Sequence, residues 1–418
     1  MIQTNNFKAG LLGRKLSHSF SPQIHAHLAD YAYTLVELEP EEVGAFMQNL
    51  PLDAMNVTIP YKKTVMPYLA DISEEAQKIG SVNTITRTEK GLRGDNTDYY
   101  GFSYMLQKSG ISVKEKKCLV LGSGGASVTV QAVLRDLGAR VTVISRSGEN
   151  NYDNIQMHND ADVIVNTTPV GMYPHTGVSP VDLSVFEHLS GVLDLIYNPA
   201  QTQLLLDAKK LHIPCINGLT MLTAQAKKAC ELFLKTEIGD SEIDRITSAV
   251  AQTCENIILI GMPGCGKSTA GQALAKRLGR KFADTDAVIE QKAGMPIPQI
   301  FAQYGEAHFR ALEHEAVCEC AKQSGLVLAT GGGVIKTKEN FDALHQNGRV
   351  IWLQRDLSDL PVDGRPLSQK DGTQKLYEER KPLYEHFCDA TAQCESDVQQ
   401  TAENILTSFL HLFEEENP

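Results

Sequence analysis

The chain has 418 residues, more than one ordinary domain holds, so its length predicts two or three domains. Hydrophobic residues make up 42% and charged residues 22%, which is typical of globular proteins and excludes a disordered chain. The formal net charge of −12 argues against a nucleic-acid-binding protein. No apolar run reaches the ~18 residues that span a bilayer, and the first twenty residues lack the apolar core of a secretory signal. The nine cysteines are scattered without a C-x-x-C pair, so we expect a reducing, cytoplasmic compartment.

Short apolar runs alternate with helical stretches along most of the chain, which predicts an α/β protein with parallel sheets. The expected strands include Lys117–Leu121, Val141–Ile144, Val163–Asn166, Gly191–Leu195, Ile257–Ile260, Leu326–Ala329 and Val350–Leu353. The segment 236–254 is polar and charged and precedes a strong strand, so we place the main domain boundary there. The alternative is a plain surface helix over Glu242–Val250.

The stretch Lys117–Ser127 predicts a strand, a glycine turn and the start of a helix. Gly122 permits the turn, and Gly124 lets the backbone approach a pyrophosphate at the positive end of the helix. An unoccupied strand-to-helix turn is the alternative. The next strand leads into Ser145 and Arg146 instead of an acidic residue, which favours a ribose 2′-phosphate and therefore NADP(H).

Three polar clusters upstream are not needed by a plain dinucleotide-binding domain: 17–22, 56–62 and 94–98. The first offers hydroxyls that could hold a carboxylate. The other two carry Lys62 and Asp98. Reduction of a ketone needs a proton donor at the new alkoxide, and a lysine ammonium beside a carboxylate can provide it. Taken singly, Lys62 reads as a surface lysine and Asp98 as a helix cap.

These clusters, together with Gly80–Thr84, Asn166–Met172, Asp194–Asn198 and Asn217–Gln225, resemble the shikimate dehydrogenases over about residues 8–234. The resemblance implies that Lys62 and Asp98 form the catalytic pair. It implies substrate contacts from Ser19, Ser21, Thr58, Asn83, Tyr197 and Gln225, and NADP(H) contacts from Gly122, Gly124, Gly125, Ala126, Ser145, Arg146, Asn166, Thr167 and Gly218. One departure is Tyr99-Tyr100 after Asp98, where many relatives have a smaller residue first.

A second glycine-rich loop lies in Asn256–Thr269, where an apolar strand runs into G-x-x-x-x-G-K-S and then an amphipathic helix. The spacing predicts a phosphate-binding loop for ATP with Mg²⁺, in which the Lys267 ammonium reaches the phosphates and the Ser268 hydroxyl ligates the metal. The expected nucleotide contacts are Gly261, Gly264, Cys265, Gly266, Lys267, Ser268 and Thr269. The Cys265 thiol is expected to be accessible when ATP is absent; the alternative is a harmless small residue.

Later motifs at Phe282–Asp286, Gly305–Glu313, Ala329–Val334 and Arg380–Tyr384, with Arg365, resemble the shikimate kinases over about residues 255–390. Taken singly, they read as a helix cap, a surface ion pair and a tight turn. The resemblance implies that Asp286 orients the accepting hydroxyl and that Asp284 and Ser268 support Mg²⁺. It also implies a carboxylate clamp made of Arg310, Arg380, Gly331, Gly332 and Gly333, and a lid that brings Arg365 to the transferred phosphoryl group.

The two resemblances name consecutive steps, so we expect a bifunctional enzyme that reduces 3-dehydroshikimate to shikimate and then phosphorylates shikimate. The expected domains are 1–100 with 217–235 for substrate, 101–216 as a Rossmann domain for NADP(H), 236–254 as a linker, and 255–418 as a P-loop kinase of the nucleoside-monophosphate-kinase type. The expected partners are small molecules, without nucleic acid or membrane. The alternatives are a quinate/shikimate dehydrogenase fused to a small polyol-acid kinase, and a non-catalytic nucleotide-sensing regulator.

Overall fold

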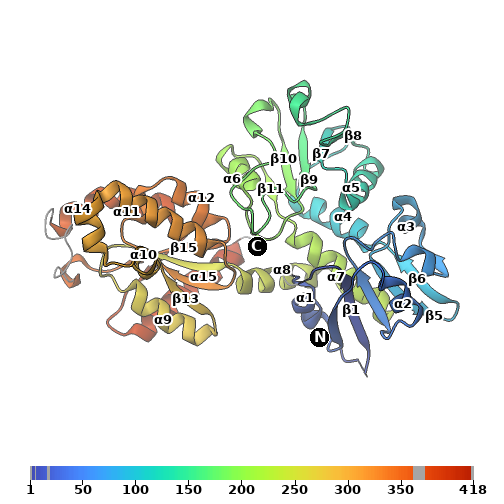
Figure 1. Cartoon of the computed structure of the whole chain (residues 1–418), viewed down its shortest axis with the longest axis horizontal. Helices are drawn as coiled ribbons and strands as arrows, with labels where there is room; N and C mark the ends of the chain where they lie inside the picture. Colours follow the sequence, from blue (N-terminus) through green and yellow to red (C-terminus); the bar gives the residue numbers. More distant parts are fainter. Residues whose placement is uncertain (1, 5, 17–18, 361–371, 416–418) are drawn as a thin grey trace. The chain divides into compact units, whose positions relative to one another are not determined.

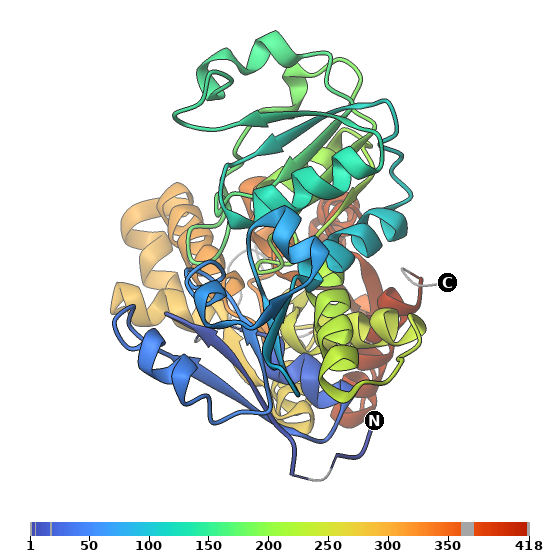
Figure 2. The same cartoon turned by 90° about the vertical axis from the view of Figure 1, so that its right-hand side faces the viewer.

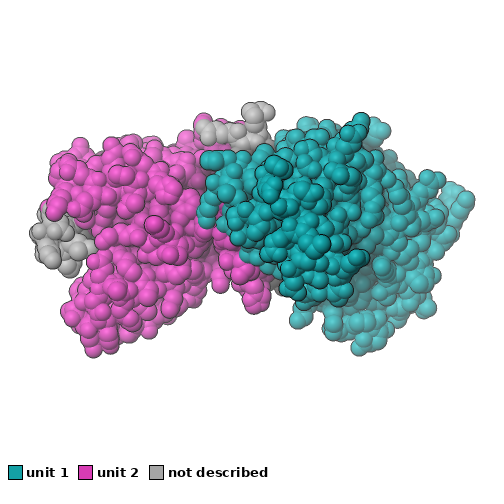
Figure 3. All heavy atoms as spheres, turned by 90° about the horizontal axis from the view of Figure 1, so that it is seen from above, with its two compact units in different colours: residues 1–170, 179–197, 207–250 teal, residues 171–178, 198–206, 251–418 magenta. Residues whose placement is uncertain are grey.

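The computed structural model describes residues 2–4, 6–16, 19–360 and 372–415. It divides into two compact units, which Figure 3 shows in two colours. Unit 1 comprises Met1–Val170, Ser179–Tyr197 and Asp207–Val250, and unit 2 comprises Gly171–Val178, Asn198–Leu206 and Ala251–Pro418. None of the helices in the described ranges is long and apolar enough to cross a membrane.

Unit 1 begins with a six-stranded mixed sheet in the order β2-β1-β3-β5-β6-β4. Its strands are β1 (Lys8–Gly13), β2 (Ala32–Glu37), β3 (Ala54–Val57), β4 (Asp71–Ile72), β5 (Thr84–Thr88) and β6 (Gly91–Asp95), with helices α1 (Ser21–Leu28), α2 (Val43–Gln48) and α3 (Glu74–Ile79). β1 pairs in parallel with β2 and β3, whereas β5 runs antiparallel to both β3 and β6. Parallel pairing brings the carboxyl ends of β1 and β3 to one edge of the sheet.

The second sheet of unit 1 is parallel and has the order β11-β10-β9-β7-β8. Its strands are β7 (Lys117–Leu121), β8 (Arg140–Ile144), β9 (Val163–Asn166), β10 (Gly191–Asp194) and β11 (Cys215–Ile216), with helices α5 (Gly125–Asp136) and α6 (Gln203–Lys210). The expected strands lie where the apolar runs predict them, because continuous apolar runs suit strands covered on both faces. The strand order reverses between β7 and β9, where open α/β sheets bind their ligands.

Two long helices lie between the sheets of unit 1, as both Figure 1 and Figure 2 show: α4 (Thr97–Ser109) and α7 (Leu219–Leu234). They pack against each other, and α7 also packs against α1 and β5. The chain therefore returns to the first sheet after completing the second, so that α7 can contribute side chains to a site at the first sheet.

The polar segment 236–254 is mostly a helix, α8 (Ser241–Cys254), which begins in unit 1 and ends in unit 2. The boundary between the units falls at Val250, inside the predicted segment. α8 buries Ile243, Ile246 and Val250, which recur on one helical face. The segment is thus helical, as the alternative interpretation expected over Glu242–Val250, and one face of the helix is buried. Three apolar residues spaced among polar ones are enough to hold the helix against a core.

The departure from the dehydrogenase pattern is at Tyr99, whose hydroxyl donates to Asp136 Oδ2 of α5 (2.8 Å). Two further tyrosines of α4 contact the start of α8. The Tyr100 hydroxyl donates to Asp240 Oδ1 (2.6 Å), just before α8 begins, and the Lys227 ammonium of α7 contacts the same carboxylate (2.8 Å). Tyr104, one turn further along α4, donates to Asp244 Oδ1 (3.4 Å). Tyr100 and Tyr104 thus hold the start of α8 in unit 1.

Unit 2 is built on a parallel sheet in the order β13-β14-β12-β15-β16. Its strands are β12 (Asn256–Ile260), β13 (Lys281–Asp284), β14 (Leu326–Ala329), β15 (Gly348–Gln354) and β16 (Ala390–Gln393), and its helices are α9 (Lys267–Leu278), α10 (Thr285–Ala293), α11 (Ile297–Ala321), α12 (Glu339–His345), α14 (Thr373–Phe387) and α15 (Val398–Glu415). The central strand β12 is buried along its whole length. The strand order changes direction at β12, which places a ligand-binding edge at its carboxyl end.

Candidate functional site

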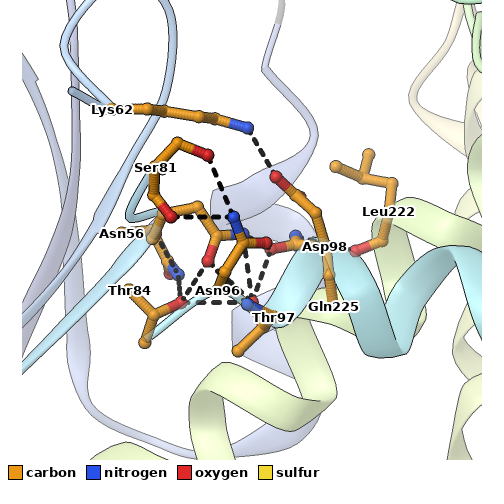
Figure 4. A network of polar contacts seen from close by, with 10 residues as sticks. Asn56, Lys62, Ser81, Thr84, Asn96, Thr97, Asp98, Leu222 and Gln225 are labelled. Carbon is orange, nitrogen blue, oxygen red and sulfur yellow. Dashed lines mark hydrogen bonds and ion pairs between the residues drawn. The ribbon is translucent and has the colours of Figure 1, made fainter. Parts of the chain in front are cut away.

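A lysine and an aspartate form a close ion pair in unit 1 (Figure 4). Lys62 follows β3, Asp98 lies in the first turn of α4, and 2.6 Å separates Lys62 Nζ from Asp98 Oδ2. The side chains are 19% and 12% exposed. Shielding from water makes such a pair stronger than one on the open surface. The N-cap residue of α4 is Asn96, so Asp98 is not the helix cap, and its carboxylate contacts Lys62 instead.

Buried amides and hydroxyls lie beside this pair (Figure 4). Asn83 Oδ1 accepts from the Thr97 backbone N–H (2.7 Å), and Asn83 Nδ2 donates to Thr97 Oγ1 (3.1 Å) and Gln225 Oε1 (3.5 Å). Asn83 precedes β5 and Gln225 comes from α7, so residues 142 positions apart meet here. The cluster is polar but uncharged, which suits the hydroxyl groups of a small ligand.

Five polar residues of this cluster were not predicted as site residues: Asn56, Ser81, Thr84, Asn96 and Thr97. Asn56 Nδ2 donates to Thr84 Oγ1 (3.2 Å), and Asn96 Nδ2 donates to the Ser81 carbonyl (2.9 Å). Asn56 and Asn96 stand inside motifs that the sequence already marks, at 56–62 and 94–98. A buried asparagine within such a motif was the available signal, because buried amides need partners.

The predicted carboxylate-binding residues, Ser19 and Ser21, come after β1, whereas Thr58 and Tyr197 are predicted to hold other groups of the substrate. Ser19 Oγ accepts from the Ser21 backbone N–H (3.3 Å) where α1 begins. Thr58 follows β3, and its N–H donates to the Leu12 carbonyl of β1 (2.8 Å). Tyr197 is near them, since its ring centroid is 5.2 Å from that of Phe20.

The first glycine loop joins β7 to α5 at the point where the strand order reverses. Gly122 has φ +103°, and a Cβ on it would lie 2.8 Å from Thr167 Oγ1. A Cβ on Gly124 or Gly125 would meet nothing within 4 Å, which leaves room for a pyrophosphate at the start of α5. Ser127, which replaces the third glycine of the pattern, is fully buried and donates to the Gly122 carbonyl (2.7 Å). The departure therefore stabilises the loop.

The other predicted dinucleotide contacts surround this loop. Arg146 is exposed directly after β8, next to β7. Asn166 ends β9, and its Nδ2 donates to Asp194 Oδ1 (3.0 Å). Gly218 precedes α7, and a Cβ there would lie 2.0 Å from the Leu195 carbonyl oxygen, so only glycine fits. The remaining predicted contacts, Ala126, Ser145 and Thr167, follow the ends of β7, β8 and β9. The residues present fit NADP(H).

In unit 2 the second glycine loop joins β12 to α9. Gly264 and Gly266 have φ of +83° and +102°, as a loop that turns its N–H groups toward phosphate requires. Lys267 Nζ donates to the carbonyls of Gly261 (2.9 Å) and Met262 (3.0 Å).

The cysteine of this loop corrects one expectation. The side chain of Cys265 is 0% exposed, so the thiol is not accessible, although it lies 3.9 Å from the Lys267 ammonium. The Cys394 thiol donates to the Cys265 carbonyl (3.0 Å), which helps to cover the loop. The small thiol packs into the hydrophobic core of unit 2.

The predicted metal ligands lie together at the end of β13. Ser268 Oγ donates to Asp284 Oδ2 (2.5 Å), and Asp284 Oδ1 accepts from the Asp286 backbone N–H (3.0 Å). Clusters of three or more His, Cys, Asp or Glu side chains suited to a metal ion do not occur among the described residues. The Ser268 hydroxyl and the Asp284 carboxylate suit Mg²⁺, which binds one or two carboxylates plus the phosphates of its nucleotide and keeps several waters.

The carboxyl group of Asp286 is buried and has a raised pKa. Burial raises its pKa to about 6, the nearby Asp284 adds to the rise, and Lys267 opposes it. Burial likewise raises the pKa of Glu313, against the effect of Arg310. Asp286 Oδ1 and Glu313 Oε1 are buried without a hydrogen-bond partner among the described residues, and both face Gly331. Buried carboxylate oxygens without donors point to a ligand that brings hydroxyl groups.

The predicted carboxylate clamp gathers next to these oxygens. Arg310 pairs with Glu313 (2.7 Å), and a Cβ on Gly333 would lie 2.5 Å from its guanidinium. Arg380 donates to the Gly332 carbonyl (2.8 Å). Arg365 lies outside the described residues.

Two family models match the chain. The model described as the shikimate dehydrogenase substrate binding domain matches residues 11–85, and the model described as shikimate kinase matches residues 263–411. The first match covers most of the first sheet of unit 1, up to the start of β5. The second match runs from the second glycine loop of unit 2 into α15.

Known proteins resemble the dehydrogenase half over almost their full length. Shikimate dehydrogenase (NADP(+)) of Clostridium beijerinckii is 37% identical over 268 residues, which are 59% of this chain and 97% of the relative. A chorismate mutase/shikimate 5-dehydrogenase fusion of Clostridium acetobutylicum is similar in structure (TM-score 0.56, 38% identity, 59% of this chain and 98% of that one). The Thermus thermophilus shikimate 5-dehydrogenase solved with NADP(H) and shikimate is also similar (TM-score 0.54, 29% identity, 58% and 99%).

These matches place both glycine loops in known enzyme families. The chain belongs to the shikimate dehydrogenase family and carries a shikimate kinase domain in its C-terminal region.

Proposed function

We propose that one chain carries out two consecutive reactions, the NADPH-dependent reduction of 3-dehydroshikimate to shikimate and the ATP-dependent phosphorylation of shikimate at its 3-hydroxyl. The observation that carries the proposal is that its two halves match families whose names share one metabolite. Bound NADPH supplies the hydride, and ATP with Mg²⁺ supplies the phosphoryl group. The proposal includes a cytoplasmic location, with small molecules as the partners and neither nucleic acid nor a membrane.

In the reduction, the Lys62 ammonium donates the proton that the new alkoxide needs, and Asp98 orients that ammonium. The 2.6 Å contact supports this division of roles. Ser19 and Ser21 hold the carboxylate. The other groups of the substrate are held by Thr58, Asn83, Tyr197 and Gln225. Arg146 and the Gly122–Ala126 turn bind the dinucleotide.

In the phosphorylation, Asp286 accepts a hydrogen bond from the attacking hydroxyl and orients it, and its partnerless oxygen supports this role. Arg310, Arg380 and the Gly331–Gly333 amides hold the carboxylate. Lys267 and the loop amides neutralise the phosphates, and Ser268 and Asp284 hold the metal. Arg365 meets the transferred group. This division suits a reaction that depends mainly on positioning and charge neutralisation.

Quinate is the nearest alternative substrate, because a quinate dehydrogenase of Corynebacterium glutamicum solved with NAD also matches (TM-score 0.53, 26% identity). Arg146 favours shikimate dehydrogenation with NADP over this alternative. A non-catalytic sensor is disfavoured because Lys62 and Asp98 form the ion pair that proton transfer needs.

The test is to follow NADP⁺ reduction by the purified chain with shikimate or quinate, and NAD⁺ reduction likewise. We expect shikimate with NADP⁺ to have the highest kcat/KM, and ADP release only when shikimate and MgATP are both present. Preference for quinate with NAD⁺, or nucleotide binding without turnover, would contradict the proposal.

A further inference from the structure

A tyrosine behind the substrate residues of unit 1 belongs to no motif of the sequence analysis. Tyr33 is the second residue of β2, and its hydroxyl donates to Asn56 Oδ1 (2.9 Å). Its ring stacks on His25 of α1, with centroids 4.0 Å apart and planes inclined by 13°. Burial lowers the pKa of His25 to about 3, so an uncharged imidazole holds the ring in place.

The Tyr33 hydroxyl lies between two parts of the site. It donates to Asn56 of β3, and the Tyr33 ring stacks on His25, one turn after Ser21 on α1. Burial raises the pKa of Tyr33, and the Ser21 side chain opposes that rise. Ser21 is one of the two hydroxyls assigned to the substrate carboxylate. Tyr33 therefore connects the start of α1 to the strand that leads into the Lys62 turn.

The chain of hydrogen bonds continues from Asn56 to the amide cluster. Asn56 Nδ2 donates to Thr84 Oγ1 (3.2 Å) and to the Asn83 carbonyl (3.4 Å), and Thr84 Oγ1 donates to Asn83 Oδ1 (3.0 Å). An amide presents its oxygen and its nitrogen to different partners, so whatever donates to Asn56 Oδ1 also decides where Asn56 Nδ2 points. The Tyr33 hydroxyl is that donor. Without this hydrogen bond, the orientation of the Asn56 amide, with its nitrogen toward Thr84 and Asn83, is no longer fixed from the oxygen side.

We propose that Tyr33 is a positioning residue for the dehydrogenase substrate, which fixes Ser21 and the Asn56–Asn83 amides in one arrangement so that the carboxylate and the ring hydroxyls are held together. Tyr33 acts through these residues and need not touch the substrate itself. The inference rests on the proposed function, since it takes Ser21 and Asn83 as substrate-binding residues.

The test is Tyr33→Phe, which keeps the ring and its stacking on His25 and removes only the hydroxyl. We expect KM for shikimate to rise about tenfold, as for a lost hydrogen bond that leaves a buried amide oxygen unsatisfied. kcat should change less than about threefold, and KM for NADP⁺ and the kinase activity should stay as in the wild type. The matched control is Tyr31→Phe, because the Tyr31 hydroxyl bonds to His25 Nδ1 (2.5 Å) in the same aromatic cluster. It should leave KM for shikimate unchanged.

A double-mutant cycle adds a readout that general destabilisation would not move. If Tyr33 works through Ser21, Tyr33→Phe should raise KM much less in a Ser21→Ala background than in the wild type. An unchanged KM in Tyr33→Phe, an equal rise in Tyr31→Phe, a parallel rise for NADP⁺, or full additivity with Ser21→Ala would each overturn the proposal. A wild-type chain without shikimate-dependent NADP⁺ reduction would instead overturn the proposed function, so the two failures are distinct.

Discussion

Replacing Asp286 by asparagine should inactivate the kinase and at the same time stabilise unit 2. Burial and Asp284 raise the Asp286 pKa from 3.8 to about 6, so keeping this carboxylate ionised costs free energy in the folded chain. The difference corresponds to about 3 kcal/mol, at ~1.4 kcal/mol for each pKa unit. Asparagine has nearly the same shape without the charge, so the variant should regain most of that amount at neutral pH.

The raised pKa of Asp286 also predicts at which pH the variant is more stable than the wild type. The folded chain binds the Asp286 proton more tightly than the unfolded chain does, so the related stability is fully present below pH 3.8 and is lost as the pH rises through about 6. The Asp286→Asn variant has no carboxyl group at this position, so it does not lose this stability as the pH rises. The gain in unfolding free energy should therefore be close to zero near pH 4 and reach about 3 kcal/mol above pH 7.

Urea denaturation followed by tryptophan fluorescence measures this directly. The chain has one tryptophan, Trp352, which is buried in β15, so its emission reports the unfolding of unit 2. The matched control is Asp359→Asn, an exposed aspartate of the same unit, which should change stability little at either pH. A variant that is no more stable than the wild type at pH 7.5, or whose gain is the same at pH 4.5, would refute the reasoning about the site.

Four further outcomes are expected. Lys62→Ala should lower kcat of the dehydrogenase by ~10²- to 10⁴-fold in a steady-state assay and leave the kinase unchanged; equal loss of both activities would contradict its role. Arg146→Ala should raise KM for NADPH about 10- to 100-fold and KM for NADH little, since only the 2′-phosphate loses a charge-assisted hydrogen bond, and equal effects would refute the NADP assignment. Iodoacetamide should inactivate the kinase at the same rate in wild type and Cys265→Ala because the thiol is buried, whereas marked protection by the substitution would show that it is reached. A chain ending at Val250 should have a melting temperature several degrees above one ending at residue 240, which lacks the buried face of α8, and equal values would show that α8 adds nothing.

The sequence predicted the layers and both glycine loops well, because continuous apolar strands and glycines before a helix are local patterns. For 236–254 it left a linker and a surface helix open, because only three apolar residues, Ile243, Ile246 and Val250, form the buried face of the helix. It also missed the roles of Asn56 and Tyr33. Their partners lie 23 to 28 residues away on other parts of the sheet, so no local spacing predicts them. The burial of Cys265 could not be predicted either, because the direction of one side chain within a loop depends on what β16 places behind it.

The most direct test of a two-step enzyme supplies the intact chain with 3-dehydroshikimate, NADPH and MgATP and follows all products by mass spectrometry. The wild type should form shikimate 3-phosphate. Lys62→Ala should form it only when shikimate is added, and Asp286→Asn should stop at shikimate. A wild-type chain that oxidises NADPH without ever producing shikimate 3-phosphate, or variants that each block both steps, would contradict the assignment of one reaction to each glycine loop.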